Sequence, residues 1–173
     1  MIEFDVRRAD HGRLLISHDP IRTGSRGLPT LEETLRLTQG RIQLDVELKE
    51  PGCERDAIEL LLQYFPLRGF CVTSFLTPAL REIRAINPDI RTGLIFAKWN
   101  ESIRAAALSA DVDLLVAHYR HLDESETIGK PIFVWTVDDP ALTRELFERP
   151  LVEAIVTNNP RQALMLRQQL LKD

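Results

Sequence analysis

The feature that most limits how this chain folds is the alternation of helical and strand patterns from residue 54 to the end. Helical patterns at 54–65, 78–87, 100–110, 140–148 and from 160 alternate with apolar runs at 70–75, 91–96, 112–117, 131–137 and 154–157. The stretch 123–129 is poorly patterned and is expected to be a connection. Strict alternation with short loops predicts parallel strands joined by right-handed crossovers, and therefore an α/β fold.

Helix starts are marked by residues that accept hydrogen bonds from free helix amides. Three expected helices follow a capping residue and a proline, at Thr77-Pro78, Asp139-Pro140 and Asn159-Pro160, which suits N-cap and first-turn chemistry. Thr30 with Glu33 forms a capping box, so we expect a helix from there to about residue 38.

The first and third apolar segments carry acids on alternate positions. A strand over 1–6 would direct Glu3 and Asp5 to one face, and a strand over 41–49 would do the same with Asp45, Glu47 and Lys49. Helices normally cover the outer face of parallel strands, so these polar faces must look into a shared interior. A barrel supplies that interior. The sequence therefore predicts a TIM-type (β/α) barrel, whereas a doubly wound sheet would need continuous apolar strands and a glycine-rich phosphate loop.

Composition sets the class of protein and of partner. With 173 residues, 44% hydrophobic, the chain is expected to be a single domain over 1–173. The net charge of -4 and pI near 5.6 argue against nucleic acid or an anionic membrane as the main partner. No segment predicts membrane insertion or a secretory signal, so a cytoplasmic location is expected. Cys53 and Cys71 are expected to be reduced thiols.

Chemistry in a parallel barrel gathers where the strands end. There Glu3, Asp5 and Glu47 would meet, and carboxylates this close repel one another strongly without a cation, so we infer a divalent metal. His18 follows the apolar run 14–16 and would bring an imidazole to the same end. Lys49 would add an ammonium, suited to an anionic substrate. Two alternatives stay open: a structural His18 holding Asp19, and a Lys49 that only pairs with acids.

These residues stand in motifs that resemble those of the glycerophosphodiester phosphodiesterase family, in the family's order from the first residue almost to the last. The motifs are Ile2-Glu3-Phe4-Asp5-Val6, the Gly12 turn leading to His18-Asp19-Pro20, Leu28-Pro29-Thr30-Leu31-Glu32-Glu33, Val46-Glu47-Leu48-Lys49, Ser74-Phe75, Val134-Trp135-Thr136-Val137-Asp138-Asp139, and Ile155-Val156-Thr157-Asn158. A chance match of them all is very improbable.

The resemblance implies metal-dependent hydrolysis of glycerophosphodiesters to glycerol 3-phosphate and an alcohol. By that resemblance Glu3, Asp5 and Glu47 hold Mg or Ca, and His18 is one of two catalytic histidines. Lys49 acts beside the phosphate as a catalytic and substrate-binding residue. Trp135, which general packing rules would place in the core, becomes a substrate-binding wall of the glycerol pocket. The partner implied is a small phosphodiester substrate.

The chain departs from the family's pattern at its front. The family's first strand and helix, with their His-Arg-Gly and Glu-Asn-Thr motifs and the second histidine, are not in this sequence. The barrel is therefore expected to be incomplete and turnover to be weakened, unless the native protein starts further upstream. The alternative is a catalytically impaired phosphodiester-binding or regulatory remnant. Open sheet edges at 2–6 and 154–157 predict a homo-oligomer.

Overall fold

The computed structural model describes residues 1–9, 12–21 and 27–171 of the 173-residue chain. Two compact units make up the chain, Met1–Leu94 with Ala110–Val112, and Ile95–Ser109 with Asp113–Asp173. Each is described by itself below. The expectation of one domain over 1–173 stays a prediction.

The first unit is organised around one sheet. Its strands run in the order β2-β1-β3-β4-β5, and their bounds are β1 Ile2–Arg8, β2 Leu14–Ile16, β3 Leu44–Leu48, β4 Phe70–Ser74 and β5 Thr92–Phe96, the last of which continues into the second unit. β1 pairs antiparallel with β2. On its other side β1 pairs parallel with β3, β3 with β4, and β4 with β5. The predicted parallel strands are confirmed here.

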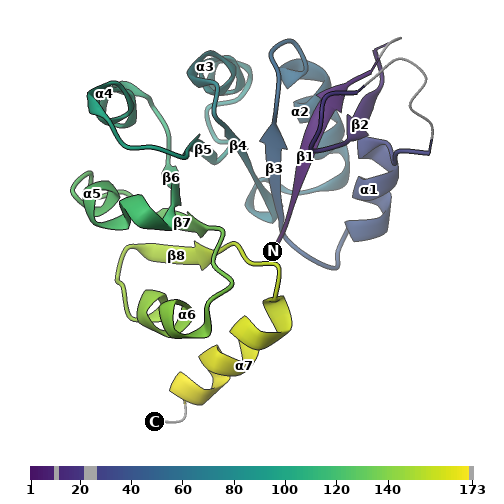
Figure 1. Cartoon of the computed structure of the whole chain (residues 1–173). Helices are drawn as coiled ribbons and strands as arrows, with labels where there is room; N and C mark the ends of the chain where they lie inside the picture. The colour runs from purple at the N-terminus through teal and green to yellow at the C-terminus, as the bar shows by residue number, and fades with distance from the viewer. Residues whose placement is uncertain (10–11, 22–26, 172–173) are drawn as a thin grey trace. The chain divides into compact units, whose positions relative to one another are not determined.

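Helices of the first unit pack along one side of β1, β3 and β4, as Figure 1 shows. They are α1 Leu31–Thr38, α2 Glu54–Tyr64, the short 3-10 helix η2 Leu67–Gly69, and α3 Thr77–Ile86. The capping box is confirmed, because the Thr30 side chain accepts from the Glu33 amide and the Glu33 carboxylate accepts from the Thr30 amide. Gly40, at φ 71°, takes the left-handed conformation that follows a helix end.

The two faces of β3 have different chemistry, and both are buried. Leu44, Val46 and Leu48 are fully buried with the apolar core. On the alternate face Asp45 and Glu47 are only 2% and 8% exposed. The register pairs Glu3 with Asp45 and Asp5 with Glu47 across β1 and β3. The prediction that this polar face is turned to an interior rather than to water is therefore confirmed.

The second unit has a smaller parallel sheet in the order β6-β7-β8. Its elements are α4 Glu101–Ser109, β6 Leu114–His118, the 3-10 helix η3 Tyr119–His121, α5 Leu122–Glu126, β7 Ile132–Trp135, α6 Pro140–Phe147, β8 Val152–Ile155 and α7 Pro160–Leu170. In Figure 1, α5 lies beside β6 and β7, and α6 lies between β8 and α7.

Two local predictions were wrong. The stretch expected as a connection, 123–129, is helical over its first part, where α5 buries Leu122 and Ser125 in a segment too short and polar to show a helical period. The N-cap of α3 is Leu76 and not Thr77, and no side chain caps that helix. Asn159 stands at the N-cap of α7 without a side-chain bond, whereas Asp139 accepts from the Leu142 amide as predicted.

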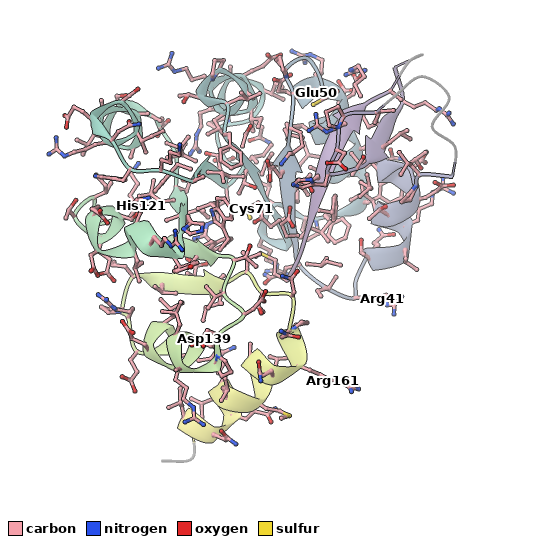
Figure 2. All side chains as sticks on the ribbon, viewed as in Figure 1. Arg41, Glu50, Cys71, His121, Asp139 and Arg161 are labelled. Carbon is pink, nitrogen blue, oxygen red and sulfur yellow. The ribbon has the colours of Figure 1, made fainter. Side chains whose placement is uncertain are left out.

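Other expectations concern thiols and membranes. Cys53 and Cys71 are both buried and neither is in a disulfide, in agreement with two reduced thiols. Figure 2 shows Cys71 among the strands of the first unit, while Arg41 projects from its surface. Within the described ranges, no helix has both the length and the apolar character needed to cross a bilayer.

The two polar caps of the second unit make a matched pair for a stability test. We expect Asp139→Ala to lower the free energy of unfolding by about 1 kcal/mol, because the Leu142 amide loses its acceptor. Asn159→Ala should cost less than about half of that, since Asn159 makes no such bond. Urea unfolding midpoints would measure both; equal losses would contradict the assigned caps.

Candidate metal centre

Three carboxylates meet on the polar face of the first unit. Glu3 and Asp5 lie two residues apart on β1, and Glu47 lies opposite Asp5 on β3. One ligand oxygen from each lies within 4.8 Å of the others. The side chains that the sequence predicted to meet are thus together. Their spacing suits oxygen coordination of a hard divalent cation.

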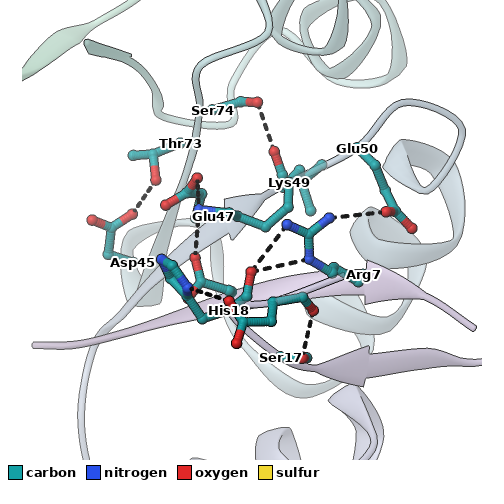
Figure 3. Close-up of polar contacts among 12 residues, drawn as sticks. Arg7, Ser17, His18, Asp45, Glu47, Lys49, Glu50, Thr73 and Ser74 are labelled. Carbon is teal, nitrogen blue, oxygen red and sulfur yellow. Dashed lines mark hydrogen bonds and ion pairs between the residues drawn. The ribbon is translucent and has the colours of Figure 1, made fainter. Parts of the chain in front are cut away.

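Lys49 lies between two of these acids. Its Nζ is 2.8 Å from Glu47 Oε1 and 3.2 Å from Asp5 Oδ1, and Figure 3 shows it among the polar side chains of the site. Burial acts to lower the pKa of Lys49, but its bonds to Glu47 and Asp5 outweigh burial and raise it above the usual value. Lys49 therefore carries a positive charge at neutral pH. It offsets part of the negative charge of the cluster.

The acids retain more negative charge than Lys49 balances. Burial raises the pKa of Glu47 to about 7, although Lys49 opposes the shift. Glu3 as a whole residue is exposed, but protein atoms surround its carboxyl group. This partial loss of water, together with repulsion from Asp5, Asp45 and Glu47, raises the pKa of Glu3 to about 8. Both shifts show that full ionisation is costly without further positive charge.

A buried oxygen of Glu47 tests whether a cation fits. Glu47 Oε1 is buried, and its recorded ion pair is with Lys49 Nζ at 2.8 Å. A carboxylate oxygen has two lone pairs and can bind a second positive partner, for which a hard cation is well suited. The residues present therefore fit Mg or Ca. Which ion binds stays a proposal.

A fourth carboxylate, Asp45, lies in the same row as Glu47 but deeper in the protein. Its Oδ1 accepts from Thr73 Oγ1 at 2.7 Å and lies 3.6 Å from Cys71 Sγ. Burial raises the pKa of Asp45 to about 6, and the two bonds act against that shift. The sequence reasoning gave Asp45 no role of its own. The alternation of 41–49 placed it on the polar face, but only the structure shows its partners.

His18 lies just beyond β2, and its backbone is close to the cluster. The amide of Ser17 donates to the backbone carbonyl of Asp5 at 3.0 Å. This bond places the backbone just before His18 next to one of the three acids. The imidazole is 79% exposed, and its Nδ1 lies 3.3 Å from Asp19 Oδ1. An exposed imidazole is accessible to a substrate. The pairing with Asp19 is also what a structural histidine would make, so both interpretations remain.

Trp135 belongs to the second unit, at the end of β7. Its Nε1 donates to the Val116 carbonyl at 3.0 Å, and its ring packs edge-on against His118 at 5.3 Å between centroids. The residue is half-buried. These contacts fix the orientation of the indole, and its role at a substrate stays a prediction.

One aromatic side chain at the site was not assigned a role from sequence. Phe75 follows β4, is 43% exposed, and has Lys49 Nζ 5.7 Å from its ring centre. Its position directly after a strand end is the signal that sequence reasoning could have used, since such positions face the functional end of a parallel sheet.

Comparison with known proteins shows what the chain is similar to. No family model matches it. A glycerophosphodiester phosphodiesterase from Caldanaerobacter subterraneus subsp. tengcongensis is 24% identical over 153 residues, which are 80% of this chain. The chain spans 61% of the length of that curated relative.

Solved structures share the fold. A glycerophosphodiester phosphodiesterase from Parabacteroides distasonis matches 97% of this chain and 84% of its own at a TM-score of 0.77 and 24% identity. An Oleispira antarctica phosphodiesterase in complex with sn-glycerol-3-phosphate matches 96% of this chain and 84% of its own, at a TM-score of 0.79 and 21% identity. The likeness confirms the predicted fold class, a TIM-type (β/α) barrel that this chain spans in part. In sequence and fold, then, the chain is similar to glycerophosphodiester phosphodiesterases.

The raised pKa values predict how cation binding depends on pH. Near pH 7, Glu3 and Glu47 hold protons part of the time, and a cation must displace them. We expect the affinity for Mg or Ca to rise between about pH 6 and pH 8 and binding to release protons. Calorimetry in two buffers of different ionisation enthalpy would measure this release.

Glu47→Gln should weaken the same binding on the order of 100-fold, by removing a ligand charge. Glu59→Gln on the exposed side of α2 is the matched control and should bind as the parent chain does. Equal affinity in all three chains, or binding that takes up no protons and releases none at pH 7, would contradict the proposed centre.

Asp45 predicts a second pH effect, on stability. Its pKa rises from 3.8 to about 6 on folding, so the folded chain keeps a proton that the unfolded chain releases. The free energy of unfolding of the metal-free chain should therefore fall as pH rises through this window. Asp45→Asn removes the effect. The free energy of unfolding of this variant, relative to that of the parent, should therefore increase by on the order of 2 kcal/mol from pH 4 to pH 7. Urea unfolding of both chains at both pH values checks this; a difference between the two chains that does not change with pH would contradict it.

Proposed function

We propose that this chain, similar in sequence and fold to glycerophosphodiester phosphodiesterases, catalyses metal-dependent hydrolysis of glycerophosphodiesters to glycerol 3-phosphate and an alcohol. The observation that carries the proposal is the meeting of Glu3, Asp5 and Glu47 within 4.8 Å beside the ammonium of Lys49. A phosphodiester is an anion, and attack on its phosphorus needs this negative charge to be neutralised.

In this proposal Glu3, Asp5 and Glu47 hold a divalent cation, Mg or Ca. The cation, when bound, supplies the positive charge that offsets the phosphodiester oxygens. Lys49 is charged at neutral pH and binds a phosphate oxygen as a second cationic group. The Oleispira antarctica neighbour, in complex with sn-glycerol-3-phosphate, supports a small glycerol phosphate as the kind of molecule recognised.

His18 supplies proton transfer. Its imidazole is open to solvent, and an imidazole has one nitrogen that can accept a proton and one that can donate it. Water attacks phosphorus directly, or a glycerol hydroxyl attacks first and water then opens the cyclic phosphate that forms. In either route the bond from phosphorus to the alcohol oxygen breaks, and the alcohol leaves with a proton. His18 accepts a proton from the attacking group or gives one to the leaving oxygen. Trp135 is proposed as an apolar wall for the glycerol moiety.

The alternative is a phosphodiester-binding or regulatory remnant with impaired turnover. It is favoured by the pairing of Lys49 with two carboxylates, which competes with binding of a phosphate. Both functions use the same acids and the same ammonium, so substrate binding does not separate them, but turnover does.

Two further features stay predictions. The cytoplasm is the expected compartment, in keeping with two buried cysteines that form no disulfide. A homo-oligomer formed through sheet edges is expected to show as a concentration-dependent sedimentation coefficient at micromolar protein, and a constant monomer value would count against it.

The activity test measures glycerol 3-phosphate released from glycerophosphocholine or glycerophosphoethanolamine by the purified chain with Mg or Ca. We expect His18→Ala to lower kcat by roughly 100-fold to 10,000-fold, as the loss of a general acid or base does. Glu47→Gln should abolish the dependence on added metal together with most turnover. Glu59→Gln should leave the rate unchanged.

The outcomes separate the two functions. If the parent chain turns over substrate no faster than His18→Ala does, the proposal that this chain is an enzyme is contradicted. Binding of the substrate with retained metal dependence, without turnover, would then favour the remnant.

A further inference from the structure

Arg7 lies on the same face of β1 as Glu3 and Asp5 and reaches toward His18. Its side chain is 13% exposed. Nε and Nη2 both donate to the His18 carbonyl, at 3.2 Å and 3.0 Å, as Figure 3 shows. Two nitrogens of one guanidinium thus bind a single backbone oxygen. This arrangement limits both the distance and the direction of the peptide that follows β2.

Glu50 holds the other side of this guanidinium. Glu50 Oε2 accepts from Arg7 Nη1 at 3.1 Å, and Oε1 accepts from the Arg8 amide at 2.6 Å. Since Glu50 follows Lys49 directly, it links the end of β3 to the end of β1. A charged acceptor on one side and the His18 carbonyl on the other leave Arg7 little freedom to rotate.

The imidazole of His18 has few contacts of its own. It is 79% exposed, and its recorded polar contact is Asp19, itself 91% exposed. Packing therefore does not fix its place, and the backbone must. Two contacts hold that backbone to β1: the Ser17 amide bonds the Asp5 carbonyl at 3.0 Å, and Arg7 bonds the His18 carbonyl. Arg7 supplies the second of these.

We propose that Arg7, oriented by Glu50, is a positioning residue that fixes the backbone of His18 relative to the carboxylate cluster. The kinetic part of this proposal rests on the function proposed above, while the structural part does not. A misplaced acid or base costs rate without weakening substrate binding to the same degree, because orientation matters most in the transition state.

The kinetic test is a double-mutant cycle with the full chain and added Mg. Arg7→Gln should lower kcat by about 10- to 100-fold and change KM by less than about 3-fold. In the His18→Ala background the same substitution should lower kcat by less than about 2-fold, because no imidazole remains to be placed. If the fold-loss in kcat of the double variant equals the product of the fold-losses of Arg7→Gln and His18→Ala, the proposal is overturned.

Arg8 provides a matched control. It is the neighbouring arginine of β1, but it points to the opposite face, where it donates to the Gly52 carbonyl and pairs with Asp56 at 2.8 Å. Arg8→Gln should leave kcat within about 2-fold of the parent. Arg7→Lys keeps the charge but not the planar fork that binds the His18 carbonyl through two nitrogens, so its kcat should be at least about 5-fold below that of the parent. A kcat equal to that of the parent would overturn the proposal.

A second measurement needs no turnover. Steady-state ¹H–¹⁵N NOE values of the His18 and Asp19 amides report fast backbone motion. They should fall in Arg7→Gln and stay unchanged in Arg8→Gln; unchanged values in Arg7→Gln would overturn the proposal. If the parent chain shows no turnover, the proposed function fails and these amides alone decide the role of Arg7. If Arg7→Gln does not fold, Glu50→Gln takes its place, with a smaller fall at the same two amides.

Discussion

Repulsion between carboxylates is the interaction on which the first unit depends. Parallel pairing of β1 and β3 places Asp5 opposite Glu47 and Glu3 opposite Asp45, and of these four acids Asp45 and Glu47 are buried. The protein offsets the resulting charge in three ways: by raised pKa values, by Lys49, and by hydrogen bonds such as that from Thr73 to Asp45. A bound cation would complete this compensation, which is why binding and proton release are linked.

The row of Asp45, Glu47 and Lys49 shows how one strand divides this work. Asp45 is the most buried of the three and accepts a hydrogen bond from Thr73, whereas the buried Oε1 of Glu47 forms an ion pair with Lys49. Lys49, nearest the strand end, bridges Glu47 and Asp5. In the proposed site, the order along the chain would run from a structural acid, Asp45, to a metal ligand, Glu47, to a charged group beside the substrate, Lys49. A substrate phosphate would compete with the acids for the Lys49 ammonium.

Much of this arrangement was readable from the sequence, and the rest has a clear physical reason. Period-two alternation identified the polar faces, and helix–strand alternation identified the parallel sheet, because both follow from burial of apolar side chains. The α5 helix was missed because five residues show no period. The contact of Arg7 with His18 and Glu50 was also missed, since it joins side chains to distant backbone through rotamers that no local pattern encodes.

The β1–β2 hairpin has a consequence for how the site assembles. Glu3 and Asp5 lie on β1 and His18 follows β2, which pairs antiparallel with the end of β1, whereas Glu47 lies on a strand that comes after α1. Closing a short loop costs less conformational entropy than closing a long one. We therefore expect the segment that carries the β1 acids and His18 to come together early in folding, and the pairing of β3, with Glu47 and Lys49, to follow.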